Sequence, residues 1–136
     1  MVDSLSPVAL PAVLQGRYRV GPVVGRGGAS TVYRARDLLL GRDVAIKVFS
    51  TRAVSPEDLR TQEGEARMLG GLNHPGLVGL LDAGVDLTDA SAPQMYLIME
   101  FVEGSDLRQR LRQGALNPFE VAYLGWDLLG ALEYVH

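Results

Sequence analysis

Residues 18–49 decide the fold, and they read YRVGPVVGRGGASTVYRARDLLLGRDVAIKVF. Tyr18–Val24 is rich in β-forming residues, Thr31–Arg36 alternates with period two, and Val44–Phe49 is a short apolar run. Each of these patterns is typical of a β-strand. Turns that contain glycine separate them, and Pro22 restricts the first to an edge or bulged strand. This stretch therefore predicts three strands in an antiparallel meander.

The rest of the chain predicts one helix, two further strands and then helices only. A capping box at residues 55–58 starts a helix that ends near Leu69, because a glycine pair follows it. Apolar stretches at 77–85 and 95–101 indicate two more strands. Helical patterns follow at 104–114 and 117–136. We therefore expect an α+β fold, with a five-stranded antiparallel sheet and one helix inserted after its third strand.

The composition excludes several functional classes. The 136 residues are 47% hydrophobic and carry a formal net charge of −3, with acidic and basic residues interleaved. No basic stripe indicates a nucleic-acid surface, and no apolar run approaches the roughly 18 residues that cross a bilayer. The absence of cysteine excludes disulfides, thiolate metal sites and cysteine nucleophiles. It is also compatible with a cytoplasmic location, which we expect.

Residues 1–16 precede the first expected strand. They are mildly apolar, but Asp3 stands near the start, a basic leading segment is missing, and Pro7 and Pro11 interrupt the stretch. A secretory signal peptide has the opposite features. We expect residues 1–16 to be a flexible lead-in to one domain over residues 17–136.

A glycine-rich turn, Gly25-Arg26-Gly27-Gly28-Ala29-Ser30, joins the first two expected strands. Glycine lets a backbone approach a phosphate closely and aim its N–H groups at it, although ordinary hairpins use glycine too. A dinucleotide-binding fingerprint needs a helix after the glycines, whereas Thr31–Arg36 predicts a strand. A P-loop needs Gly-Lys-Ser/Thr, which the sequence lacks. A phosphate-binding turn between two strands is the interpretation that remains.

Lys47 lies in the third expected strand, 20 residues after Gly27. Taken alone, a lysine in such a strand is most simply a solvent-facing residue on a half-buried sheet. Together with the glycine-rich turn, it falls where its ammonium group can reach phosphates bound there. We therefore interpret Lys47 as a phosphate ligand.

Lys47 needs a carboxylate to hold it, and we consider three acidic residues of the helix after this strand, Asp58, Glu63 and Glu65. Asp58 is already explained by helix capping. At about 100° per residue, Glu63 lies about 160° around the helix from Glu65. Glu65 points toward apolar side chains that we expect to be buried, namely Met68, Leu69 and Leu72. Glu65 is therefore the expected partner of Lys47.

These residues resemble the bacterial serine/threonine protein kinases of the eukaryotic (Hanks) type. The resemblance spans roughly Tyr18–His136 and rests on five strings in the family's order: GRGGASTV at 25–32, VAIK at 44–47, Glu65, LNHP at 72–75 and MEFVEG at 99–104. Ser30 stands at the third glycine position of the family pattern, so we expect a somewhat stiffer turn. The resemblance implies the small lobe of a kinase at about 17–99, a hinge at 100–104 and the start of the large lobe at 105–136.

The resemblance also implies an activity, the transfer of the γ-phosphoryl group of ATP to serine or threonine of protein substrates, with Mg²⁺. Gly25–Val32 would cover the phosphates, Lys47 would hold the α- and β-phosphates, and Glu65 would orient Lys47. Backbone groups of Glu100 and Val102 would hydrogen-bond to adenine, and Asp106 would reach the ribose. The side chains around the base would be those of Val24, Val32, Ala45 and Met99. Met99 would be the gatekeeper.

Three family strings do not occur in the 136 residues: H-R-D-x-x-x-x-N, D-F-G and A-P-E. They carry the general base, the magnesium ligands and the activation segment, and we expect them after His136. We therefore expect this chain alone to be inactive. Two alternatives stay open: a pseudokinase or non-catalytic nucleotide-binding scaffold, and a small-molecule kinase such as an aminoglycoside or choline kinase. The second resembles the sequence less in the glycine-rich turn and hinge.

The last expected helix opens with Asn117-Pro118-Phe119-Glu120, which places an N-cap, an N1 proline and an N3 glutamate in order. Its apolar residues lie along one face: Val121, Leu124, Leu128, Leu132 and Val135. The remainder of a kinase large lobe would cover that stripe. We expect the stripe to be uncovered in this chain and to promote self-association.

Overall fold

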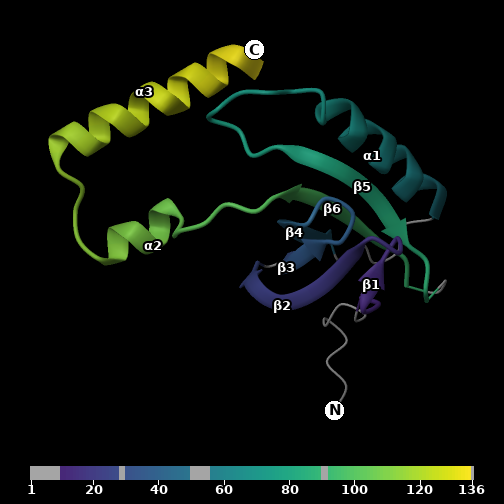
Figure 1. Ribbon diagram of the computed structural model, residues 1–136. Helices are drawn as coiled ribbons and strands as arrows, with labels where there is room; N and C mark the ends of the chain where they lie inside the picture. The colour runs from purple at the N-terminus through teal and green to yellow at the C-terminus, as the bar shows by residue number, and fades with distance from the viewer. Residues whose placement is uncertain (1–9, 28–29, 50–55, 90–91, 136) are drawn as a thin grey trace. The chain divides into compact units, whose positions relative to one another are not determined.

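The computed structural model describes residues 10–27, 30–49, 56–89 and 92–135 (Figure 1). The chain divides into two compact units. The first comprises Met1–Gly71 and Gly79–Phe101, and the second comprises Leu72–Val78 and Val102–His136. The first unit carries the sheet and one helix, and the second carries the remaining two helices.

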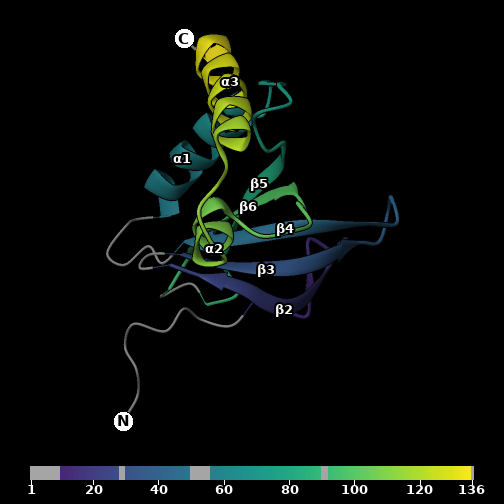
Figure 2. The ribbon, with the colours of Figure 1, turned by 90° about the vertical axis from the view of Figure 1, so that its left-hand side faces the viewer.

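An antiparallel sheet of six strands forms the first unit, in the order β1-β2-β3-β4-β6-β5. Figure 2 shows the three longest strands, β2, β3 and β4, side by side. The strands are β1 (Val13–Leu14), β2 (Tyr18–Arg26), β3 (Ser30–Asp37), β4 (Arg42–Phe49), β5 (Leu80–Asp86) and β6 (Gln94–Glu100). The expected antiparallel meander is confirmed for β2, β3 and β4. Strand β5 starts at Leu80, whereas the sequence predicted a strand from residue 77.

The additional strand β1 corrects the expected five-stranded count. Val13 and Leu14 pair with Arg19 and Tyr18 of β2, and the Leu14 side chain is buried. A tight turn reverses the chain at Gln15 and Gly16, which both have positive φ angles. The flexible lead-in predicted over residues 1–16 is therefore wrong at Val13 and Leu14, while residues 1–9 lie outside the described residues.

β2 carries the bulge that Pro22 predicted. The pairing register with β3 shifts between Val20 and Val23, so the residue without a backbone N–H lies outside the regular ladder. Gly21 precedes it at a point where the two strands approach closely. A Cβ atom at Gly21 would lie 2.7 Å from the carbonyl oxygen of Arg34, so only glycine fits there. β1 pairs with Tyr18 and Arg19 only, so Pro22 lies in a bulged part of β2 that β1 does not cover.

The two faces of the sheet have different partners. One face holds the main apolar core, which includes Tyr18, Tyr96, Ile46 and Ile98. Helix α1 (Pro56–Leu69) packs against β5 and β6 and forms a smaller cluster that includes Ala66 and Ala83 (Figure 1). The helix starts at Pro56 and ends at Leu69, as predicted. Ser55, the expected cap, lies outside the described residues, as does the side chain of Asp58.

A buried carboxylate closes the turn between β3 and β4. Asp37 is fully buried and accepts hydrogen bonds from Nε and one terminal nitrogen of Arg17, each at 2.9 Å. It also accepts the N–H groups of Leu39 and Leu40. The Arg17 hydrogen bonds are the main cause that holds the pKa of Asp37 well below its usual range. The carboxylate is therefore ionised and fully bonded at neutral pH.

The second unit contains α2 (Leu107–Arg112) and α3 (Pro118–Val135). Asn117 and Glu120 form the predicted capping box, since each side chain accepts the backbone N–H of the other, at 2.8 and 3.2 Å. The stripe residues predicted to be uncovered are exposed: Val121 by 55%, Leu128 by 57%, Leu132 by 52% and Val135 by 44%. Leu124 is partly buried, and Phe119 and Trp126 are more exposed still.

The segment 72–78 packs on the C-terminal half of α3. The rings of His74 and Tyr134 lie 5.3 Å apart, and His74 Nδ1 accepts the N–H of Gly76. A Cβ atom at Gly76 would lie 2.9 Å from the Cβ of Ala131, so glycine permits this approach. His74 thus has a packing role. No helix among the described residues is both long and apolar enough to span a membrane.

Candidate functional site

The glycine-rich turn joins the end of β2 to the start of β3. The Gly27 N–H donates to the carbonyl of Ser30 at 2.8 Å, while Gly28 and Ala29 lie outside the described residues. Gly25 and Gly27 do not have positive φ angles, and a Cβ atom at either would meet only ordinary contacts. Neither the backbone conformation nor the packing of the described residues therefore requires glycine at these two positions. Glycine there leaves room for a ligand.

The sheet register brings the predicted site residues of β3, β4 and β6 together. Lys47 lies opposite Val32 on one side and opposite Leu97 on the other. In the neighbouring row, Ala45 lies between Arg34 and Met99. Cross-strand partners share a face of the sheet, and so do residues two apart on one strand. One face of the sheet, opposite the main core, therefore carries Val32, Ala45, Lys47 and Met99. Gly25 pairs with Val32 at the edge of this group.

Two further predicted site residues, Val24 and Arg26, lie at the end of β2. Val24 falls in a register shift between Val23 and Gly25, and its side chain is half exposed. Arg26 is paired with Thr31 and is exposed. Both therefore lie beside the glycine-rich turn, but in a part of β2 where the ladder is irregular.

Lys47 is half-buried rather than solvent-facing. Its ammonium nitrogen lies 5.3 Å from the centre of the Phe49 ring, the next side chain on the same face. Among the side chains that the structure describes, no carboxylate forms an ion pair with Lys47. The side chain of Glu65 is not among them, so the pairing of Lys47 with Glu65 stays a prediction.

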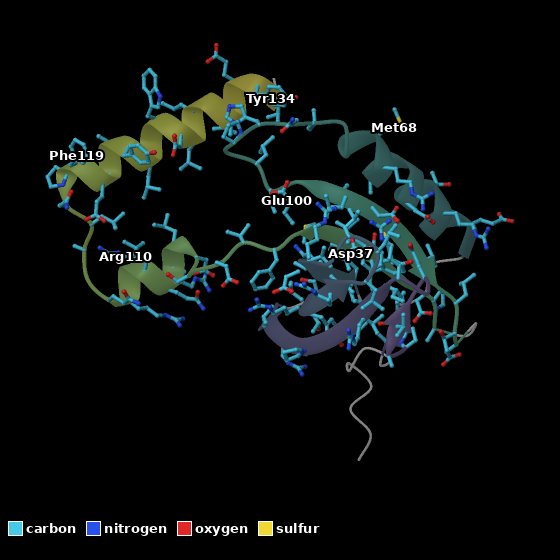
Figure 3. The ribbon with its side chains drawn as sticks, in the orientation of Figure 1. Asp37, Met68, Glu100, Arg110, Phe119 and Tyr134 are labelled. Carbon is cyan, nitrogen blue, oxygen red and sulfur yellow. The ribbon has the colours of Figure 1, made fainter. Side chains whose placement is uncertain are left out.

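The helix-face argument that favoured Glu65 is wrong in one respect. Met68, which was expected on the buried face, is 82% exposed and points away from α1 (Figure 3). Glu63, expected to face solvent, has a side chain only 16% exposed and pairs with Arg67 at 2.7 Å. Arg67 in turn donates to the carbonyl of Ala83 on β5, so this side of α1 faces the sheet. The role of Glu65 therefore rests on the family resemblance alone.

The strand β6 ends at Glu100, the first residue of the expected hinge (Figure 3). Its N–H donates to the carbonyl of Gly79 at 2.9 Å. Of the two backbone polar groups of Glu100, only the carbonyl oxygen then remains to accept a hydrogen bond from a ligand. Met99, the expected gatekeeper, is half-buried beside Ala45.

Val102 and Asp106 belong to the second unit. The Val102 side chain is 68% exposed. Asp106 is the N-cap of α2, and its carboxylate accepts the backbone N–H of Gln109 at 2.7 Å. Helix capping thus accounts for an aspartate at this position without a ligand, and the expected contact with a ribose stays a prediction.

Sequence reasoning missed one group of charged residues in the first unit. Arg34 and Arg36 on β3 both donate to the carboxylate of Asp43 on β4, and the guanidinium of Arg34 lies over the ring of Phe101. The signal was available in part, because two arginines at i and i+2 point to the same face of a strand. Their partners, however, follow only from the cross-strand register.

A magnesium site is not formed by the described residues, since none of their acidic or histidine side chains cluster as metal ligands.

The protein kinase domain family matches residues 18–136. The chain therefore belongs to the protein kinase domain family, and the sheet with its inserted helix is the N-terminal portion of that fold. Similar proteins include a probable serine/threonine-protein kinase of Streptomyces coelicolor, 43% identical over 129 residues. The serine/threonine-protein kinase PknB of Mycobacterium tuberculosis is 38% identical over 128 residues. These matches cover 93% of this chain but only 19% and 20% of the two relatives, so the chain spans about a fifth of their length.

Proposed function

We propose that this chain is the ATP-binding part of a serine/threonine protein kinase, which transfers the γ-phosphoryl group of ATP to serine or threonine of protein substrates. The observation that carries the proposal is the register of the sheet. It sets Lys47 beside Val32, at the edge where Gly25 begins the glycine-rich turn, and packing of the described residues does not require glycine at positions 25 and 27. A lysine next to an open glycine-rich turn is suited to bind phosphate oxygens.

The proposed roles follow from this placement. Backbone N–H groups of the turn would bind the phosphates, and Lys47 would hold the α- and β-phosphates by charge-assisted hydrogen bonds. Ala45 and Met99 would contact the adenine ring from the neighbouring row, and the carbonyl of Glu100 would accept a hydrogen bond from it. Glu65 would orient Lys47. When bound, Mg²⁺ would neutralise phosphate charge, and its ligands would come from residues outside these 136.

Nucleotide binding is the direct test of this proposal. The complete chain is titrated with ATP, ADP and adenosine, and Lys47→Met is titrated in parallel. A hydrogen bond to a charged group contributes about 1.5–3 kcal/mol, so the variant should bind ATP about 10- to 100-fold more weakly. Adenosine has no phosphate, and its affinity should not change. Equal ATP affinity in both proteins would contradict the proposed role of Lys47.

Glu63 and Glu65 of α1 provide a matched pair for the same titration. Glu65→Gln should weaken ATP binding in the direction of Lys47→Met, because Lys47 loses its proposed partner. Glu63→Gln should leave ATP affinity unchanged and affect thermal stability only, since Glu63 pairs with Arg67. Equal effects of the two variants on ATP affinity would argue against Glu65.

A non-catalytic nucleotide-binding scaffold would give the same binding results. Phosphoryl transfer from labelled ATP to a protein substrate, assayed with a protein that contains this chain within a complete kinase domain, separates the two. We place the reaction in the cytoplasm, where ATP is available.

A further inference from the structure

Arg34 and Phe101 form a stacked pair at the end of β6. The guanidinium carbon of Arg34 lies 4.2 Å from the centre of the Phe101 ring, well within the range of a cation–π contact. Arg34 is on β3, in the row that contains Ala45 and Met99. The side chain thus crosses the same face of the sheet to which the proposed adenine contacts belong.

Asp43 holds the Arg34 guanidinium in this position. Oδ2 of Asp43 accepts Nε of Arg34 at 3.0 Å and also a terminal nitrogen of the same guanidinium. Oδ1 accepts a terminal nitrogen of Arg36 at 2.9 Å. Hydrogen bonds from Arg34 and then Arg36 lower the pKa of Asp43, so the carboxylate stays ionised at neutral pH. Two atoms of the guanidinium are fixed, which orients its plane over the ring.

Phe101 is the first residue after the end of β6. The sheet ladder ends at Glu100, and residues 101–103 have no regular secondary structure in the described chain. Glu100 is fixed through its N–H bond to Gly79. On the other side of the Glu100–Phe101 peptide, the stack with Arg34 fixes the Phe101 side chain. The peptide plane, including the Glu100 carbonyl, is therefore held from both ends.

We propose that Arg34 is a positioning residue for nucleotide binding, which orients the Glu100 carbonyl toward adenine by clamping Phe101. The inference rests on the proposed ATP site and adds a residue that does not itself touch the nucleotide. Arg34 acts on the base end of the ligand. Lys47, in the row nearer the glycine-rich turn, acts on the phosphate end.

The same arginine could instead attract the triphosphate through its charge. The two explanations predict different ligand dependences. Clamping changes the affinity for ATP, ADP and adenosine by one common factor, because all three carry adenine. Charge attraction changes ATP most, leaves adenosine unchanged and weakens with added salt.

The experiment titrates ATP, ADP and adenosine into the complete chain and four variants, Arg34→Leu, Phe101→Leu, the double variant and the control Arg36→Leu. Arg36 lies on the same strand and bonds the same carboxylate, but Arg34 is the arginine stacked on Phe101. A cation–π contact of this kind corresponds to about a three- to tenfold change in affinity. Arg34→Leu should weaken the binding of all three ligands by that factor. The double variant should bind them no more weakly than Phe101→Leu does, and Arg36→Leu should leave the affinities unchanged.

Amide hydrogen exchange of Phe101 in the nucleotide-free chain is the second readout. Arg34→Leu should accelerate it, Arg34→Lys should do so less, and Arg36→Leu should not. The inference would be overturned if Arg34→Leu left either the Phe101 exchange rate or the adenosine affinity unchanged. It would also be overturned if the variant weakened ATP binding alone, or if the effects of Arg34→Leu and Phe101→Leu on affinity were additive in the double variant. If the unaltered chain binds none of the three ligands, the ATP site itself fails, whereas the exchange result still shows whether Arg34 clamps Phe101.

Discussion

Replacing Gly84 with alanine tests how β5 and β6 are held together. Gly84 lies directly opposite Tyr96 in the ladder, and the Tyr96 side chain lies across it. A Cβ atom at position 84 would be 3.0 Å from Cε2 of that ring and closer still to Cζ and the hydroxyl oxygen. Tyr96 is buried, and its hydroxyl accepts a hydrogen bond from the side-chain amide of Gln15. The ring therefore has little room to move away.

The cost of the substitution combines three contributions. Overpacking a well-filled site costs about 1–3 kcal/mol, and loss of the Gln15 hydrogen bond costs about 0.5–1.5 kcal/mol. Alanine recovers about 0.5–1 kcal/mol, because glycine loses more chain entropy in a strand. The net loss is about 0.5–4 kcal/mol, and each 1 kcal/mol lowers the melting temperature of a unit of this size by about 4–8 °C.

Thermal and urea unfolding, followed by circular dichroism, measure the effect. Gly79→Ala is the matched control, because a Cβ atom there would meet the carboxylate of Glu100, an exposed and flexible side chain that can swing aside. We expect a change within about 0.5 kcal/mol for that variant. In a Tyr96→Leu background, Gly84→Ala should cost less. An unchanged melting temperature for Gly84→Ala, or an equal cost in both backgrounds, would refute the steric reasoning.

Two further predictions concern acid stability and association. Because the folded-state pKa of Asp37 is lowered, its contribution to stability is present above the unfolded pKa of about 3.9 and is lost as the pH falls below it. The stability difference between the unaltered chain and Asp37→Asn should thus shrink between about pH 5 and pH 3 in urea unfolding, and a constant difference would exclude this role. The exposed stripe of α3 should promote self-association, so sedimentation should depend on concentration and Leu128→Glu should suppress that dependence. A monomer at all concentrations would contradict it.

Local signals in the sequence determined most of the secondary structure. The capping box at Asn117 and Glu120, the start of α1 at Pro56 and the bulge at Pro22 all follow from backbone geometry and from hydrogen bonds between near neighbours. Such features need no knowledge of distant segments, so a single sequence suffices for them.

The tertiary structure decided which faces are covered and which distant residues meet. Periodicity could not show that Met68 is exposed while Glu63 faces β5, because the buried side of a helix depends on where the helix docks. It could not show that Leu14 completes the core, because a two-residue strand carries no periodic signal. The contact of Arg34 with Phe101 joins residues 67 positions apart, and only the register of the sheet brings them together. Long-range contacts of this kind depend on chain topology, which local residue preferences do not specify.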